Sequence, residues 1–181
     1  MNPQSKMRLQ LVMVGAVFLV PMLIAFGLRL ANWQPERLRN IGELVQPPQD
    51  LASNPIASDR GEFAWKDPDY RWTLLLLAGP ACGDACEAQL ANAEKVRGVM
   101  TSKATRVRLA VIGVEATDAR RARYPQTQFL RSDAPALQAL RPSGNDAIAA
   151  VVIDPAGLLV LRYAPGFDPS GVRQDLARVI R

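Results

Sequence analysis

The feature that most constrains this chain is an uncharged hydrophobic run of twenty residues, Leu9–Leu28, near the N-terminus. As a helix, such a run extends over roughly 30 Å, which is the thickness of the hydrocarbon core of a bilayer. Pro21 lies within the run, but proline is tolerated as a kink in transmembrane helices. The run predicts a single transmembrane helix, so that residues 1–31 form a cytoplasmic tail and a membrane anchor.

Two other interpretations of the run stay open at this point. The first is a buried core helix of a soluble domain, although such helices are usually shorter. The second is a cleaved signal peptide, whose apolar part is about 7–15 residues long and ends in small residues. The run is longer than that, and Gly27–Asn32 offers no suitable cleavage site. We expect an uncleaved anchor in a bacterial inner membrane. The short N-terminal tail predicts a cytoplasmic N-terminus and a periplasmic domain.

Charge and composition exclude several kinds of function. The net charge is +5, and once Lys6 and Arg8 ahead of the run are set aside, 20 basic and 17 acidic side chains remain. The basic residues are dispersed and form no patch with interleaved aromatic residues, so we expect no nucleic-acid partner. The chain has no histidine. It therefore cannot form, on its own, a Ser-His-Asp triad, a Cys-His dyad or a histidine-ligated metal site.

The rest of the chain is expected to form a connector and one domain. Residues 32–61 contain several prolines and two glycines and are predicted to be an extended linker, with room for a short strand at Ile41–Val45. The domain is expected to span residues 62–181. Its predicted strands are Arg71–Ala78, Arg106–Val114, Gln126–Arg131, Ala147–Ile153 and Leu158–Tyr163, and its predicted helices are Asp84–Met100, Glu115–Arg123, Asp133–Leu140 and Asp168–Arg181. Strands alternate with helices and are followed by a hairpin and a closing helix. This order predicts an α/β, thioredoxin-like domain behind a single N-terminal transmembrane helix.

The only two cysteines, Cys82 and Cys86, lie where the first predicted strand gives way to a helix. Open α/β sheets place reactive groups at such junctions, and a thiol in the first helical turn is favoured as the thiolate. The spacing predicts two sulfurs on one helical face, which permits a disulfide or two thiolates around one soft ion such as Cu(I). Zinc is a poor fit because it requires four strong ligands. Inert buried thiols and a purely structural disulfide are the remaining alternatives.

Together, the anchor, the buried strand, the Cys82-x-x-x-Cys86 motif and the late strand that ends in Asp154–Gly157 resemble the Sco (SenC) proteins. These are thioredoxin-like factors that assist copper loading of a cytochrome c oxidase subunit. The resemblance implies that Cys82 and Cys86 bind copper and that the partner is a respiratory oxidase subunit or an assembly factor. Two positions depart from the family pattern: Glu87 replaces a proline, and the segment Asn145–Ala147 replaces a ligand histidine.

Three functional hypotheses follow from these observations. The first is a Sco-like accessory factor for assembly of the oxidase copper centre, in which Cys82 and Cys86 act as catalytic thiols, Cu(I) ligands or both. The second is a general membrane-tethered thiol–disulfide oxidoreductase. The third is a non-catalytic scaffold with the same fold. The sequence leaves the direction of electron flow open.

Overall fold

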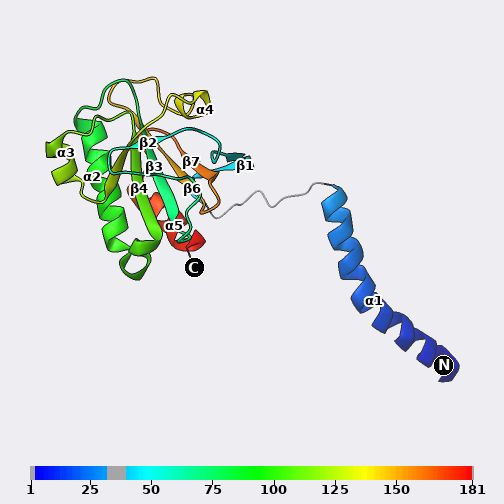
Figure 1. Ribbon diagram of the computed structural model, residues 1–181. Helices are drawn as coiled ribbons and strands as arrows, with labels where there is room; N and C mark the ends of the chain where they lie inside the picture. Colours follow the sequence, from blue (N-terminus) through cyan, green and yellow to red (C-terminus); the bar gives the residue numbers. More distant parts are fainter. Residues whose placement is uncertain (1–2, 32–39, 181) are drawn as a thin grey trace. The chain divides into compact units, whose positions relative to one another are not determined.

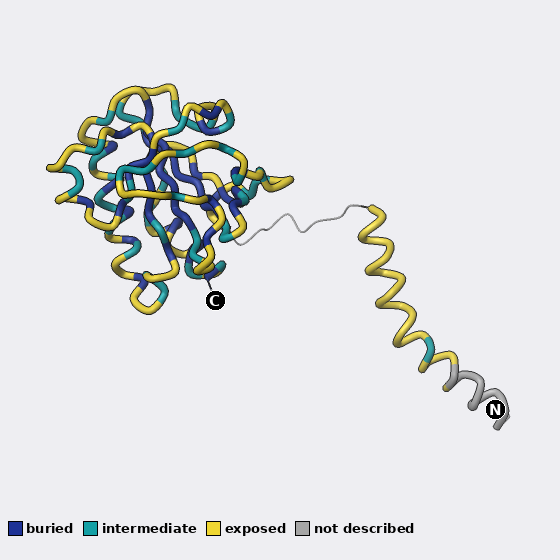
Figure 2. Tube along the Cα trace, in the orientation of Figure 1, coloured by how far each residue is buried: buried dark blue, intermediate teal, exposed yellow. Residues whose placement is uncertain are grey.

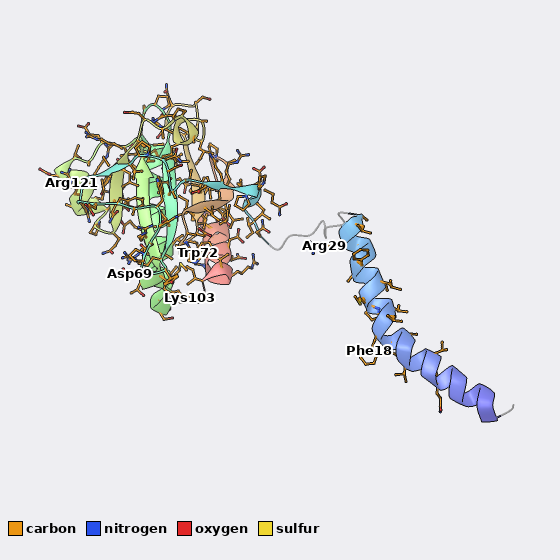
Figure 3. All side chains as sticks on the ribbon, turned by 45° about the vertical axis from the view of Figure 1, so that its right-hand side comes forward. Phe18, Arg29, Asp69, Trp72, Lys103 and Arg121 are labelled. Atoms are coloured by element: carbon orange, nitrogen blue, oxygen red, sulfur yellow. A yellow bond between two sulfur atoms is a disulfide. The ribbon has the colours of Figure 1, made fainter. Side chains whose placement is uncertain are left out.

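The computed structural model describes residues 3–31 and 40–180, and the chain divides into two units between residues 39 and 40. In the first unit, the described residues form one helix, α1 (Pro3–Leu30). Its apolar part, Val12–Leu30, is long enough to cross a membrane, and no residue in it is buried in the structure. Figure 3 shows the side chain of Phe18 standing clear of the helix, and Pro21 does not end the helix. Because these apolar side chains are exposed, the structure favours the predicted anchor over a buried core helix.

The second unit is built on a seven-stranded sheet in the order β1-β7-β6-β3-β4-β5-β2 (Figure 1). Strands β3, β4 and β5 are parallel, whereas β6, β7, β1 and β2 each run antiparallel to a neighbour. The strands are β1 (Glu43–Asp50), β2 (Ala57–Ser58), β3 (Trp72–Ala78), β4 (Val107–Ile112), β5 (Thr127–Arg131), β6 (Ile148–Ile153) and β7 (Leu158–Tyr163). The helices are α2 (Asp84–Val99), a 3₁₀ helix (Thr101–Arg106), α3 (Asp118–Arg123), α4 (Pro135–Gln138) and α5 (Pro169–Val179).

The core lies on both faces of the central strand β3. Because β3 pairs with β4 on one side and β6 on the other, its whole apolar run is buried, and Figure 2 shows these strands as the dark interior of the unit. Leu74 and Leu76 pack in one cluster with the buried sides of α2 and α5. Leu75 and Leu77 pack in a second cluster with Leu51 and with residues near α4. This alternation is the period-2 pattern of a strand covered on both faces.

The predicted linker is wrong for residues 40–61, which belong to the folded unit. Strand β1 pairs antiparallel with β7, and Leu51 is fully buried. The prolines that suggested a linker, Pro47 and Pro48, lie where the β1–β7 register shifts. Proline is tolerated at a bulge in an edge strand, because no ladder hydrogen bond is required of it there. The rest of the predicted linker, residues 32–39, lies outside the described residues.

A buried carboxylate, that of Asp175, holds the first residues of the second unit in place. Asp175 of α5 accepts hydrogen bonds of 2.8 Å from the backbone N–H groups of Ile41 and Gly42. It also accepts a hydrogen bond of 2.9 Å from the hydroxyl of Tyr163 and pairs with Arg178. Burial and the neighbouring Asp175 raise the pKa of Tyr163 above its usual range. These contacts fix the start of β1 against the helix that closes the domain.

Two predicted helix starts had different outcomes. Asp168 caps α5 as expected, because its carboxylate accepts a hydrogen bond of 2.9 Å from the N–H of Ser170. Asp133 does not cap α4, which begins at Pro135 with Ala134 in the capping position and no side-chain cap. The predicted hairpin turn is confirmed, since the Asp154 carboxylate accepts from two backbone N–H groups of the turn. The strands predicted from apolar runs are confirmed to within one to two residues at each end.

Candidate functional site

The candidate site lies at the carboxyl end of β3, where the chain turns into α2. Gly79 ends the strand at a place where a side chain would collide with the carbonyl oxygen of Gly144. Its own N–H donates a hydrogen bond of 2.8 Å to the carbonyl of Ala147. The absence of a Cβ therefore lets two loops approach closely at the top of the central strand.

Cys82 and Cys86 are joined by a disulfide, with their Cα atoms 5.2 Å apart. Only Cys86 lies in α2, which begins at Asp84, so the expectation of two sulfurs on one helical face is wrong. Cys82 belongs to the preceding loop, because Gly83 takes the extended backbone of the N-cap position. The spacing did predict that the two sulfurs could pair.

The two cysteines differ strongly in exposure. Cys86 is 0% exposed and packs in the core cluster with Leu90 and Ala93 of α2. Cys82 is half-buried at the edge of the same cluster, next to exposed residues on both sides. An attacking thiolate from outside can therefore reach the sulfur of Cys82 more readily than that of Cys86. This asymmetry is the arrangement that stepwise exchange requires.

Asp146, from the loop before β6, caps α2 from a distance of sixty residues along the chain. Its carboxylate accepts hydrogen bonds from the N–H groups of Gly83, Ala85 and Cys86, at 2.7, 3.0 and 2.9 Å. Hydrogen bonds from Cys86, Ala85 and Gly83 hold the pKa of this carboxyl below its usual range, so it is ionised at neutral pH. Its own N–H donates to the carbonyl of Ala81 at 3.0 Å. Asp146 is thus bound to both sides of Cys82.

The loop that carries Asp146 also holds the end of β3. The guanidinium of Arg141 donates hydrogen bonds of 2.7 and 2.9 Å to the carbonyls of Ala78 and Gly79. Gly113, with φ of +88°, leaves the space that this guanidinium occupies. The cysteine loop is consequently fixed at its base by Arg141 and at its helix start by Asp146.

Glu87 connects the start of α2 to α3 and to Tyr124, which follows α3. Its carboxylate accepts from Arg120 at 2.7 Å and from the hydroxyl of Tyr124 at 2.6 Å. Burial raises the pKa of Glu87, but the hydrogen bonds from Tyr124 and Arg120 outweigh it and leave the pKa lowered. Burial and the Glu87 hydrogen bond raise the pKa of Tyr124 to about 12. Glu87 therefore helps to hold α2 and α3 together.

The sequence pointed to Cys82 and Cys86 and to the segment Asn145–Ala147 at the histidine position, but the capping role of Asp146 was not predicted. One sequence feature indicated that another residue caps α2: its N-cap residue is Gly83, which has no side chain to accept a hydrogen bond, in place of a Ser, Thr, Asp or Asn. Asp84, which lies between the cysteines, is exposed in the first turn of α2. Met100, at the end of α2, packs in the core.

Within residues 3–31 and 40–180, no group of three His, Cys, Asp or Glu side chains is placed to hold a metal ion. Both oxygens of Asp146 already accept backbone N–H groups. The remaining candidate metal ligands of the cysteine pair are its two sulfurs, which in the reduced form suit a soft ion of low coordination number and not zinc.

Known proteins resemble this chain in sequence or in fold. Residues 72–181 match the family described as "Transmembrane-like, thioredoxin-like, C-terminal domain". The chain belongs to this family. No curated protein sequence matches the chain. The family match covers β3 to the C-terminus, and therefore includes both cysteines and Asp146.

Solved structures are similar to the chain at the level of the fold. Arabidopsis thaliana ScoI with copper bound is 16% identical, with a TM-score of 0.50 over 78% of this chain and 98% of that one. A putative thiol:disulfide interchange protein DsbE from Chlorobium tepidum is 13% identical, with a TM-score of 0.52 over 73% and 95%. BsSco, a Sco-family cytochrome c oxidase assembly protein with a disulfide switch, is 13% identical, with a TM-score of 0.50 over 81% and 100%.

These similarities confirm the predicted thioredoxin-like fold and the predicted likeness to Sco structures. At such low identities they establish the fold and leave the chemistry to be argued from the chain's own residues.

Proposed function

We propose that this protein is a membrane-tethered, Sco-like thiol–disulfide exchange protein whose working pair is Cys82 and Cys86. The observation that carries the proposal is the disulfide between a half-buried Cys82 and a fully buried Cys86 at the end of β3. An inert core thiol would not be paired, and a purely structural cross-link would gain little from a loop of only three intervening residues. The DsbE-like and Sco structures of similar fold support the same chemistry.

The exchange proceeds in two balanced steps. In the reducing direction, the Cys82 thiolate attacks one sulfur of a client disulfide, and the other client sulfur leaves as a thiolate and takes up a proton. The Cys86 thiolate then attacks Cys82 in the mixed disulfide, which reforms the Cys82–Cys86 bond and releases the second client thiol. Two electrons pass from the protein to the client. An upstream protein dithiol must restore the reduced pair, and in the oxidising direction every step is reversed.

The proposed location is the outer face of a bacterial inner membrane, with α1 as the anchor. Disulfides persist in such oxidising compartments and are rare in the cytosol. The proposed client is a respiratory oxidase subunit or its assembly factor, because BsSco belongs to a family of cytochrome c oxidase assembly proteins. A general oxidoreductase with many clients is the alternative. An alkaline phosphatase fused after Arg181 should be active, and an inactive fusion would contradict the orientation.

Capture of the client tests this function in the membrane. Full-length protein carrying Cys86→Ser cannot resolve a mixed disulfide, so it should accumulate a covalent adduct through Cys82 that a reductant releases. Cys82→Ser, in which only the buried sulfur remains, is the matched control and should accumulate none. An adduct that contains an oxidase subunit or its assembly factor supports the accessory role, and adducts with many unrelated proteins support the general oxidoreductase. Absence of any adduct from both variants would favour the non-catalytic scaffold.

Copper is the proposed cargo of the reduced pair. ScoI of similar fold has been solved with copper bound, and two thiolates suit Cu(I), which accepts low coordination numbers. The reduced full-length protein should bind one Cu(I) per chain and lose it on either Cys82→Ser or Cys86→Ser, as measured by competition with a Cu(I) chelator. Cu(II) should oxidise the thiols, because the oxygens of Asp146 are engaged elsewhere. Failure to bind Cu(I) would contradict the cargo proposal and leave thiol exchange alone, whereas a persistent charge-transfer band with Cu(II) would mean that another ligand, Asp146 or Asp84, takes the place of the missing histidine.

A further inference from the structure

The Asp146 carboxylate accepts the backbone N–H groups at the start of α2, which would otherwise be available to stabilise a thiolate. Backbone N–H groups in the first turn of a helix point outward and carry the positive end of the helix dipole. A cysteine thiolate beside such a turn gains stability from them, and strongly oxidising dithiols owe their potential to this stabilised reduced form. Here the N–H groups of Gly83, Ala85 and Cys86 all donate to Asp146. The Cys82 sulfur therefore has to compete with a carboxylate for the same donors.

The position of Asp146 is built into the fold. Its backbone has a φ of +58°, in the left-handed region that non-glycine residues seldom adopt. The hydrogen bond from its N–H to the carbonyl of Ala81 holds that conformation. On the other side, a Cβ at Gly83 would lie 3.0 Å from the Asp146 carboxylate, so a larger residue there would push the carboxylate away from this close approach. An unusual backbone at a reactive loop is an observation from which a functional role can be inferred.

The Asp146 carboxylate contacts the amide groups of the cysteine turn directly, whereas the neighbouring guanidinium groups bond elsewhere. Arg141 directs its guanidinium at the carbonyls of Ala78 and Gly79, and Arg120 is paired with Glu87. Asp84 adds a second carboxylate in the exposed first turn of α2. The disulfide carries no charge, whereas the reduced form gains stability when Cys82 ionises, and a nearby carboxylate opposes that ionisation. The carboxylate of Asp146 thus raises the free energy of the reduced form relative to the disulfide.

We propose that Asp146 sets the direction in which this site works: by occupying the amide donors at the start of α2 it favours the disulfide, which makes the reduced Cys82–Cys86 pair an electron donor to its client. Asp146 is a positioning residue that acts through Cys82 and does not touch the reacting client. The inference rests on the proposed exchange function and adds to it the direction of electron flow. The client is then a protein disulfide, and the thiols that it gains on reduction are free to take up a metal ion.

The test is the equilibrium of the full-length protein with reduced and oxidised glutathione at pH 7, read by counting alkylated thiols. Asp146→Asn keeps the shape and an acceptor oxygen, and asparagine tolerates the left-handed backbone, but the charge is lost and one donor is released. The equilibrium constant should shift toward the dithiol by about tenfold, which corresponds to about 30 mV for this two-electron couple. A merely structural role for Asp146 would change stability without moving this constant.

Two further variants keep the test decisive. Asp84→Asn removes a carboxylate from the same helical turn without releasing a donor, so it should shift the constant by less than about twofold. Asp146→Gly suits the positive φ and frees all three donors, so it should shift the constant in the same direction as Asp146→Asn and further, even if Asp146→Asn folds poorly. Variants at Asp146 that stay within twofold of the wild type, or that only match Asp84→Asn, would overturn the inference. A wild-type disulfide that does not exchange with glutathione at all would instead overturn the proposed function.

Discussion

In the folded protein, the Cys82 thiol left by Cys86→Ser should react with a maleimide at least a hundredfold faster than the Cys86 thiol left by Cys82→Ser. Cys86 is 0% exposed and lies in the core cluster with Leu90 of α2 and Leu76 of the central strand, so the reagent reaches it only when that region opens. Local opening that costs about 2.7 kcal/mol slows labelling by roughly a hundredfold. Cys82 is half-buried in the loop before α2, so the reagent reaches it without such an opening.

The measurement is the rate of the mass shift of each full-length variant under native conditions. The same proteins denatured in guanidinium provide the control, because both thiols should then react at similar rates. Equal rates in the folded state would mean that the cysteine loop opens freely. Strong protection of both thiols would support inert core cysteines and contradict the exchange function.

A chain that begins at Glu62 should not fold, whereas a chain that begins at Asn40 should fold stably. The shorter chain lacks strand β1 and the fully buried Leu51, and it loses the two N–H groups that donate to Asp175. A lost hydrogen bond to a charged group costs about 1.5–3 kcal/mol, and loss of a large buried side chain costs about 2–5 kcal/mol. Together these losses are comparable to the whole stability of a typical domain.

Circular dichroism during thermal unfolding distinguishes the two chains. The chain from Asn40 should show one cooperative transition, and the chain from Glu62 should show none. Asp175→Ala in the longer chain isolates the effect of the buried carboxylate and should lower its melting temperature without abolishing the transition. A chain from Glu62 that melts within a few degrees of the longer one would restore the predicted linker for residues 40–61.

The sequence predicted the parts of the fold that depend on local pattern. Strands β3 and β6 are nearly continuous apolar runs, and β4 and β7 are mostly apolar segments bounded by turns, so local pattern is enough to predict them. Strand β1 was placed in a linker because Pro47 and Pro48 interrupt it, and only its pairing with β7, more than a hundred residues away, shows how an edge strand accommodates them. Its burial depends on tertiary contacts that the local pattern does not contain.

The position of the site was likewise predicted from local sequence pattern, whereas its details were not. Two lone cysteines at a strand-to-helix junction are visible in the sequence, and their pairing is confirmed. Their unequal burial could not be predicted, because it depends on α2 starting two residues after Cys82. The role of Asp146 could not be predicted either, since its partners lie about sixty residues earlier in the chain. The missing cap at Gly83 is the only sequence feature that indicates a distant partner.

We propose above all that Cys82 and Cys86 form a disulfide that exchanges in the folded protein. The most direct test of this exchange is the thiol count of the wild-type chain across a series of glutathione buffers. Every chain should carry either no free thiol or two, with a single reversible transition between them and unchanged circular dichroism throughout. A disulfide that is reduced only when the domain unfolds, or thiols that do not pair again when the buffer is reversed, would contradict the claim.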